Sequence, residues 1–349
     1  MKFEKTIIVF FILIFLTGCT TKSPAENVQM PENIPAENEL IDKTEFKNFL
    51  IVAVNSNFVN EEGAAPRNQE KYLEISAQRI SARMIMKGIA ENNKEIIEKG
   101  IKAIEYGFEK QNEDGSFDYA DEVIEMGAIE ADFFEAGAFF MQSVGQSYFL
   151  IKESEYSAEF LPRFELLKTK MRKTMDWLYF GKEILFKKAE NAPNRLMFDG
   201  LAFKLNGKIL EEKKYETLGD EFVNSTLEKQ REDGSFIEHN GYDSSYQGVT
   251  NLKLQQYLIY SKNKELNEQI WAGVLKGIVW EKTKIKNSGE ISSNGNSRTG
   301  NCQEMFAEKC KEINYSDVAM SFVYYGLISN DSESLKIAEK ITEYATQNS

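Results

Sequence analysis

One helix gives way to the next within the stretch Glu228-Lys-Gln-Arg-Glu-Asp-Gly-Ser-Phe-Ile-Glu-His-Asn-Gly-Tyr-Asp-Ser-Ser-Tyr-Gln247, which contains the only histidine, His239. A shorter copy, Glu109-Lys-Gln-Asn-Glu-Asp-Gly-Ser-Phe117, lies 119 residues earlier. The two nine-residue windows differ at one position, Asn112 in the first and Arg231 in the second. A match at this distance indicates an internal repeat. Because Asp-Gly favours a tight turn, each copy predicts a corner between two helices.

The rest of the chain shows apolar residues at helical spacing and no convincing strand pattern. Residues 123–153 are apolar on nearly every face, which predicts a helix buried on all sides, whereas 160–180 is charged, as an outer helix would be. This alternation predicts an all-α fold, an incomplete or complete α/α toroid of about ten to twelve helices without a substantial sheet; an open α-solenoid is the alternative. The expected helices are 66–93, 95–110, 123–153, 160–180, 196–205, 210–229, 248–261, 263–281, 317–329 and 333–347.

The N-terminus is typical of a secretion signal, with a basic start, an apolar run from Ile7 to Leu16 and a small-residue processing site. Leu16-Thr-Gly-Cys19 resembles the lipobox of bacterial lipoproteins, a family in which the cysteine is lipidated. We therefore expect a signal peptide at 1–19, a disordered tether at 20–45 and a single toroid domain at 46–349. The protein is expected to be extracytoplasmic and anchored to the membrane through Cys19. Thr20 favours the outer membrane in a Gram-negative cell.

Charge and cysteine content narrow the possible partners and the compartment. The net charge of −13 argues against a nucleic-acid partner, although a local cluster of arginines could override the global sign. Outside the cytoplasm, Cys302 and Cys310 are expected to form a disulfide. Residues eight apart in a continuous helix lie ~12 Å apart, so a bond between them requires the intervening chain to bend.

The Gln-x-x-Asp-Gly-Ser-Phe corner is similar to connectors in toroidal terpene cyclases, glycoside hydrolases and polysaccharide lyases. The Asp-x-Asp-Asp motif of protonating cyclases and the zinc ligands of prenyltransferases are absent from this sequence. The extended segment from Asp233 to Gln247 most resembles the central segment of toroidal polysaccharide lyases of the alginate and heparin/chondroitin kind. Asn194-Arg195 stands where those families often have an Asn-His or Asn-Arg pair. The resemblance covers about residues 191–300.

This resemblance implies β-elimination on a uronate-containing glycan, a reaction that requires a neutralised carboxylate, a base for the C5 proton and an acid for the leaving oxygen. Asn194 and Arg195 would neutralise the carboxylate. His239 or Tyr246 would be the base, and Tyr242 or Tyr246 the acid. The alternatives are a loop histidine that bonds a carbonyl and two tyrosines that pack with satisfied hydroxyls.

Further substrate contacts are expected from a long polar loop, residues 282–301, and from the second corner. Arg298 would clamp the substrate, unless it is a solvated loop charge, and Asp243, Gln247 and Glu238 would add polar contacts. No clustered metal ligands are present in the sequence, so neither a metal nor another cofactor is predicted.

Two other functions fit the same sequence. An inverting glycoside hydrolase would need two carboxyl groups ~6.5–9.5 Å apart, which Glu238, Asp243, Asp118 and Asp233 could supply. A non-catalytic glycan-binding lipoprotein would keep the toroid without a competent acid and base.

Asp114 and Asp233 are expected mainly to stabilise their turns.

Overall fold

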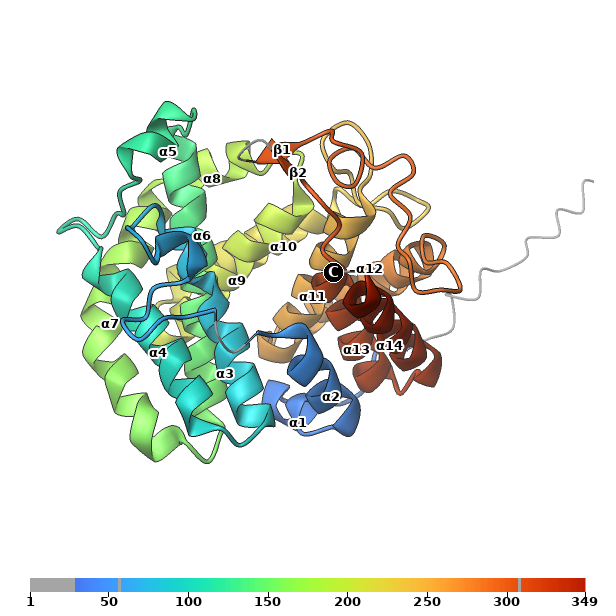
Figure 1. Cartoon of the computed structure of the whole chain (residues 1–349), viewed down its shortest axis with the longest axis horizontal. Helices are drawn as coiled ribbons and strands as arrows, with labels where there is room; N and C mark the ends of the chain where they lie inside the picture. The colour runs from blue at the N-terminus through green and yellow to red at the C-terminus, as the bar shows by residue number, and fades with distance from the viewer. Residues whose placement is uncertain (1–28, 56–57, 307–308, 349) are drawn as a thin grey trace, which may run out of the picture.

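The computed structural model describes residues 29–55, 58–306 and 309–348 and confirms the all-α prediction (Figure 1). The predicted signal peptide, Cys19 and the first part of the tether lie outside these residues. Within the described chain, the only strands are the two-residue β1 (Met305–Phe306) and β2 (Lys309–Cys310), which pair antiparallel. The helices are α1 (Glu37–Ile41), α2 (Thr44–Ala53), η2 (Pro66–Asn68), η3 (Ile75–Ile80), α3 (Ser81–Ala90), α4 (Lys94–Glu109), α5 (Asp121–Glu125), α6 (Glu130–Lys152), α7 (Ser157–Phe180), α8 (Lys182–Lys188), α9 (Pro193–Leu210), α10 (Lys213–Leu227), α11 (Ser244–Tyr260), α12 (Lys264–Lys282), α13 (Tyr315–Ser329) and α14 (Ser332–Gln347).

The helices pack as two layers, an inner set and an outer set. The inner helices η3/α3, α6, α9, α11 and α13 each contact the next in this order, and α1 and α2 contact both α13 and α3. The outer helices α4, α7, α10, α12 and α14 pack against the inner helix that precedes each of them in the chain. Each inner helix thus contacts its neighbours in this order and has an outer helix packed against it.

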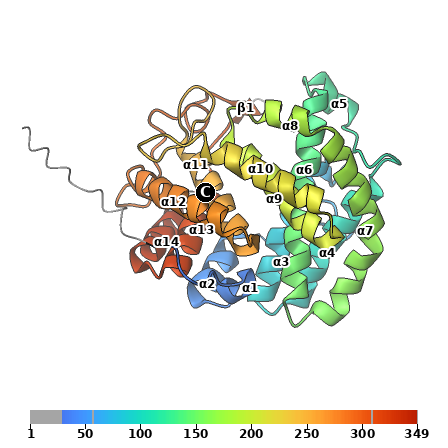
Figure 2. The ribbon, with the colours of Figure 1, turned by 180° about the vertical axis from the view of Figure 1, so that it is seen from behind.

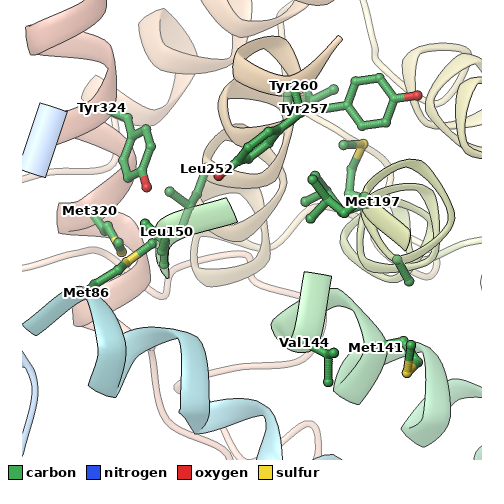
Figure 3. Close-up of a cluster of buried hydrophobic side chains, with 14 of the residues drawn as sticks. Met86, Met141, Val144, Leu150, Met197, Leu252, Tyr257, Tyr260, Met320 and Tyr324 are labelled. Carbon is green, nitrogen blue, oxygen red and sulfur yellow. The ribbon is translucent and has the colours of Figure 1, made fainter. Parts of the chain in front are cut away.

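Burial follows the two layers, because an inner helix has neighbours on most of its faces. Most residues of α6, α9 and α11 are buried, whereas α14 buries only Ser334, Ala338 and Ile341. Figure 3 shows that the inner helices share one apolar cluster. Its labelled members are Met86, Met141, Val144, Leu150, Met197, Leu252, Tyr257, Tyr260, Met320 and Tyr324.

The predicted corner occurs four times in the structure. Gly63, Gly115, Gly234 and Gly289 all have φ between +88° and +95°, and each donates its N–H to the carbonyl three residues earlier. A Cβ on any of them would lie 2.1–2.3 Å from a backbone carbonyl oxygen of an outer helix, so only glycine fits. Those oxygens belong to Lys102 of α4, Lys173 of α7, Lys276 of α12 and Lys340 of α14. Each corner precedes an inner helix, so the inner helices begin at one rim.

Several predicted boundaries are wrong. The expected helix at 66–93 begins at Ile75, because Asn68 accepts the N–H groups of Leu73 and Glu74 and holds a turn there. The expected helix at 123–153 is interrupted at Gly127, which has φ +101°. The short helix α8 was not predicted.

The predicted tether is also too long. Residues 37–41 form α1, in which Glu37, Leu40 and Ile41 are buried against the inner helices. In both Figure 1 and Figure 2, α1 and α2 lie at the lower edge of the molecule, and α5, α8 and β1 lie at the upper edge. We call the upper end, where the inner helices begin, the mouth, and the end closed by α1 the floor.

We expect Gly234→Ala to destabilise the fold more than Gly127→Ala does. Both positions have positive φ, which costs a non-glycine residue about 1–3 kcal/mol. A methyl group on Gly127 would have no neighbour within 4 Å, whereas one on Gly234 would also clash with Lys276, an overpacking cost of roughly 1–3 kcal/mol more. Urea unfolding of the two variants measures the difference; equal losses would contradict the role of the corner contact.

Candidate functional site

At the mouth, neighbouring inner helices are joined by hydrogen bonds and ion pairs at or near their first turns. The backbone N–H of His239, for example, donates to the Asn191 carbonyl at 2.7 Å and so ties the approach to α11 to the approach to α9. The other contacts are Ala120 N to Leu73 O, Arg195 with Glu135, Asn314 N to Ser245 Oγ, and Arg83 with Asp317. The side chains predicted from α9, α11 and the loops before α11 and α13 therefore lie at the same end of the molecule.

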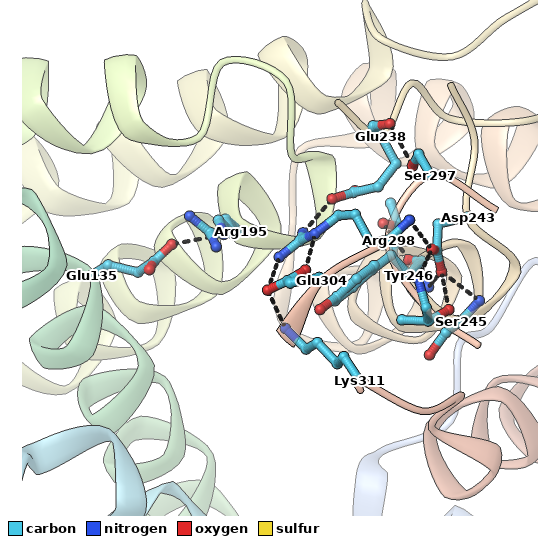
Figure 4. A network of polar contacts seen from close by, with 12 residues as sticks. Glu135, Arg195, Glu238, Asp243, Ser245, Tyr246, Ser297, Arg298, Glu304 and Lys311 are labelled. Carbon is cyan, nitrogen blue, oxygen red and sulfur yellow. Dashed lines mark hydrogen bonds and ion pairs between the residues drawn. The ribbon is translucent and has the colours of Figure 1, made fainter. Parts of the chain in front are cut away.

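Arg298 is the centre of a buried ionic network at this opening (Figure 4). Its guanidinium pairs with Glu238 and with both oxygens of Glu304, at 2.6 and 3.1 Å, and it stacks on the Tyr246 ring at 4.1 Å. Lys311 bonds Glu304 at 2.9 Å and lies 5.1 Å from the same ring. Only 3% of the Arg298 side chain is exposed, so it is not the solvated loop charge considered as an alternative. It braces Tyr246 rather than standing free in the opening.

The pKa values of the two carboxyl groups in this network shift in opposite directions. Burial raises the pKa of Glu238 to about 7, although Arg298 opposes the shift. For Glu304 burial also acts to raise the pKa, but the bonds from Arg298 and Lys311 outweigh it and lower the pKa to about 2. Glu304 is therefore the firm counter-ion of Arg298.

Asp243 and Gln247 were predicted to contact substrate, but their polar atoms are used by the chain itself. Asp243 caps α11 and accepts five hydrogen bonds, from the N–H groups of Ser245, Tyr246, Arg298 and Thr299 and from the Thr299 hydroxyl. The Gln247 amide accepts from Phe236 N and donates to the Gly234 carbonyl, which secures the second corner. Both residues position the loop and the corner around the site.

Tyr246 and His239 retain unused polar atoms. The Tyr246 hydroxyl is buried and has no hydrogen-bond partner among the described residues, and burial raises its pKa although Arg298 opposes this. The His239 side chain is exposed and makes no hydrogen bond within the described chain, at a residue with φ +53°. Partial burial, then Arg298 and Arg195, lowers the pKa of His239. At neutral pH the tyrosine is thus a proton donor and the imidazole a proton acceptor.

Asn194 and Arg195 occupy the first turn of α9 on the other side of the opening. Arg195 uses Nε to pair with Glu135 of α6 at 2.9 Å, and Figure 4 shows it between Glu135 and the Arg298 network. The Asn194 side chain is buried, and its Oδ1 has no partner in the described structure. Burial raises the pKa of Glu135, against Arg195 and Lys188, and that of the neighbouring Asp199.

The remaining predicted residues make contacts within the protein that stabilise its turns and loops. The Tyr242 hydroxyl donates to the Asn294 carbonyl at 3.2 Å, and its ring packs edge-on against Trp280. Asp114 and Asp233 each accept the N–H and hydroxyl of the serine two residues later, as expected for turns, and Asp118 accepts from Asn112.

A disulfide joins Cys302 to Cys310 across the bend that forms β1 and β2. Their Cα atoms are 4.6 Å apart. Glu304 lies inside the closed loop and Lys311 directly follows it, so the bridge helps to hold Glu304 against Arg298 and Lys311 beside the Tyr246 ring.

Below the mouth, the inner helices enclose a cavity of about 380 Å³. Its lining includes the charged residues Arg67, Arg79, Arg83, Lys253 and Asp317, together with Phe198. Burial lowers the pKa of Arg83 to about 10 and that of Lys253 to about 7. Phe198 and Lys253 lie on α9 and α11, three and seven residues after Arg195 and Tyr246. At 1.5 Å per residue, they are about 5 and 10 Å deeper than the mouth.

The predictions from sequence missed these deeper residues. The signal was a polar residue inside a segment otherwise buried: Lys253 in the expected helix 248–261, and Glu135, Gln142 and Gln146 at helical spacing in 123–153. Arg79 and Arg83 are likewise four apart on one helix face.

No protein-family model matches the chain, and no curated protein matches it. Among the described helices, none has both the length and the apolar composition of a membrane span. No group of three or more potential metal ligands occurs among the described residues.

We expect Asp243→Ala to loosen the mouth far more than a comparable capping change at Asp331, which caps α14. Asp243→Ala leaves five donors without their acceptor, two of them N–H groups of the 292–301 loop, whereas Asp331 accepts from Glu333, Ser334 and Lys282 at a half-buried site. The extra loss of stability should be roughly 2 kcal/mol or more. Hydrogen exchange at Arg298 and Thr299 should accelerate in the Asp243 variant only; protected amides there would contradict the assignment.

Proposed function

We propose that the mouth binds a uronate-containing saccharide and cleaves it by β-elimination, as the resemblance to toroidal polysaccharide lyases implies. The observation that supports this best is the Tyr246 hydroxyl, which is buried, unpartnered within the described chain and braced by Arg298 and Lys311. A buried hydroxyl without a partner can donate its proton to a ligand.

In this proposal the protein supplies an acid, a base and a cation from three different elements. His239 removes the C5 proton of the uronate, and the electron pair of that C–H bond forms the C4–C5 double bond as the C4–O bond breaks. Tyr246 gives its proton to the departing oxygen. The raised pKa of Tyr246 and the lowered pKa of His239 suit these directions of proton transfer.

The carboxylate of the reacting sugar would face Arg195. Apart from Glu135, which lies closest to Nε, the Arg195 guanidinium has no ion-pair partner among the described residues. Asn194 lies on the same turn, and its amide nitrogen, not its oxygen, would be the group that donates to the carboxylate. A cation beside the carboxylate stabilises the charge that develops on it when the C5 proton leaves.

A hydrolase is a weaker candidate because the carboxyl groups it would use are already engaged. Both oxygens of Asp243 accept bonds from the chain, Asp233 bonds its own turn, and Glu238 is paired with Arg298. Reducing ends released without an ultraviolet-absorbing unsaturated product would identify the hydrolase; saccharide binding without either product would identify a binding protein.

We expect Tyr246→Phe to abolish release of unsaturated product, while Tyr242→Phe retains most of it. Both changes remove one hydroxyl, but that of Tyr242 bonds a loop carbonyl. Loss of general acid catalysis lowers kcat by about 10²–10⁴-fold. Ultraviolet absorbance on uronate polymers measures the rate. Full activity in Tyr246→Phe, with Tyr242→Phe impaired, would reverse the assignment.

The pH profile tests the base. We expect kcat/KM to rise with pH through an inflection below 6.5, the ordinary pKa of histidine, because His239 must be neutral to accept a proton. Arg195 contributes to lowering that pKa, so Arg195→Gln should move the inflection upward. Lys264→Gln, at an exposed lysine on α12, is the control and should leave it unchanged. A kcat/KM that does not rise with pH through this range in the unmodified protein would exclude His239 as the base.

A further inference from the structure

The cavity below the mouth carries a positive charge that the proposed reaction does not use. Four cations and one carboxylate line it, in a chain whose net charge is −13. Two of the cations are neutralised locally, since Arg67 pairs with Glu74 and Arg83 with Asp317. Lys253 bonds only the neutral side-chain oxygens of Gln142 and Gln256, at 3.2 and 3.0 Å. The excess charge therefore belongs to Arg79 and, in part, to Lys253, whose pKa of about 7 leaves it partly charged at neutral pH.

Arg79 is the most available of these groups. Its guanidinium makes no hydrogen bond or ion pair with any described residue, and its contacts are with two rings, Phe139 at 5.2 Å and Phe198 at 5.9 Å. Its side chain is exposed, yet it lies deep among the inner helices and burial lowers its pKa, so the exposure is to the cavity. A guanidinium in such a place offers its N–H donors to an anion.

The surrounding helices add to the attraction for an anion. The inner helices all begin at the mouth, so the positive ends of their dipoles point toward that opening. Phe198 also lies 4.6 Å from the Lys253 ammonium and presents an aromatic ring to the cavity. Cations beside an aromatic ring suit a ligand with both a carboxylate and an apolar ring face.

The cavity is closed at its deep end. Gln146 and Gln256 line it, and both donate to Glu37, which is completely buried. Glu37 in turn accepts from Tyr260 at 2.5 Å and from Tyr324. A ligand that enters from the mouth must therefore end here. The volume of about 380 Å³ falls in the ~300–1,000 Å³ range of small-molecule pockets.

We propose that this cavity binds the acidic terminal residue of a saccharide, with its carboxylate on Arg79 and its ring against Phe198. The identity of the ligand rests on the proposed function, but the site itself rests on the cavity and its charge. A chain end held below the mouth restricts the protein to short oligosaccharides or to the ends of longer ones.

Calorimetric titration of the protein with D-glucuronate and D-glucose tests the site directly. A monosaccharide has no glycosidic bond to break, so the outcome does not depend on the proposed elimination. We expect glucuronate to bind at least tenfold more tightly than glucose, because only the acid forms a charge-assisted bond to Arg79. Equal affinities, or binding of neither sugar, would overturn the proposal. Binding of acetate as tight as that of glucuronate would reduce it to a carboxylate site without sugar recognition, which also overturns it.

Variants then locate the bound sugar. Arg79→Gln should weaken glucuronate binding about tenfold or more, whereas Lys264→Gln, which removes one exposed charge, should not. Tyr246→Phe should bind glucuronate like the wild type even if it turns over no polymer, which separates this site from the proposed reaction. Undiminished binding in a folded Arg79→Gln variant, checked by its thermal midpoint, would place the sugar elsewhere.

Discussion

The carboxylate of Glu37 is the contact on which the closed end of the molecule depends. It accepts hydrogen bonds from Gln146 of α6, Gln256 and Tyr260 of α11, and Tyr324 of α13. A buried carboxyl group is tolerated only where hydrogen bonds replace the lost water, and burial still raises its pKa. One short helix, α1, thus joins three inner helices at a single point and gives the cavity a floor.

The mouth, at the opposite end, is determined by the connections that lead into the inner helices. Four corners of the same backbone form precede inner helices, and each glycine packs on a carbonyl of an outer helix. This repeated connection makes the inner helices parallel, so their first turns surround the mouth. The residues proposed to act there come from α9, the start of α11 and the loops before α11 and α13, and α11 contacts both α9 and α13. Asp243 then fixes the loop to the first turn of α11, which brings Arg298 over Tyr246.

The sequence predicted what depends on local pattern. Apolar periodicity located most helices, and the Asp-Gly pairs located two corners. The corners at Gly63 and Gly289 were missed because they have the same backbone conformation as the other two but not the same sequence motif. Their sequences are Asn60-Glu-Glu-Gly and Lys286-Asn-Ser-Gly, which lack the Asp-Gly pair. Residues 37–41 were predicted to be disordered because their composition does not reveal the inner helices that bury them.

The site was harder to predict because the sequence does not show which partner a polar side chain will bond. Asp243 and Gln247 have the chemistry of substrate contacts, yet the loop and the corner satisfy them. Arg298 was expected to face substrate, but Glu238 and Glu304 hold it. Only folding reveals that the Arg79 guanidinium, on a different helix, makes no hydrogen bond or ion pair with any described residue.

The sign of the charge differs between the outer surface of the protein and the lining of its cavity. The chain is acidic overall, so its surface repels polyanions, although salt limits this repulsion to distances of about 8–10 Å. The lining of the cavity has the opposite sign, since Arg79 and the partly charged Lys253 lie without a carboxylate partner where the dielectric constant is low and the attraction is stronger. An anion gains this attraction only after it passes the mouth. Such a protein discriminates against binding along the outside of an acidic polymer and in favour of taking one end of it inside.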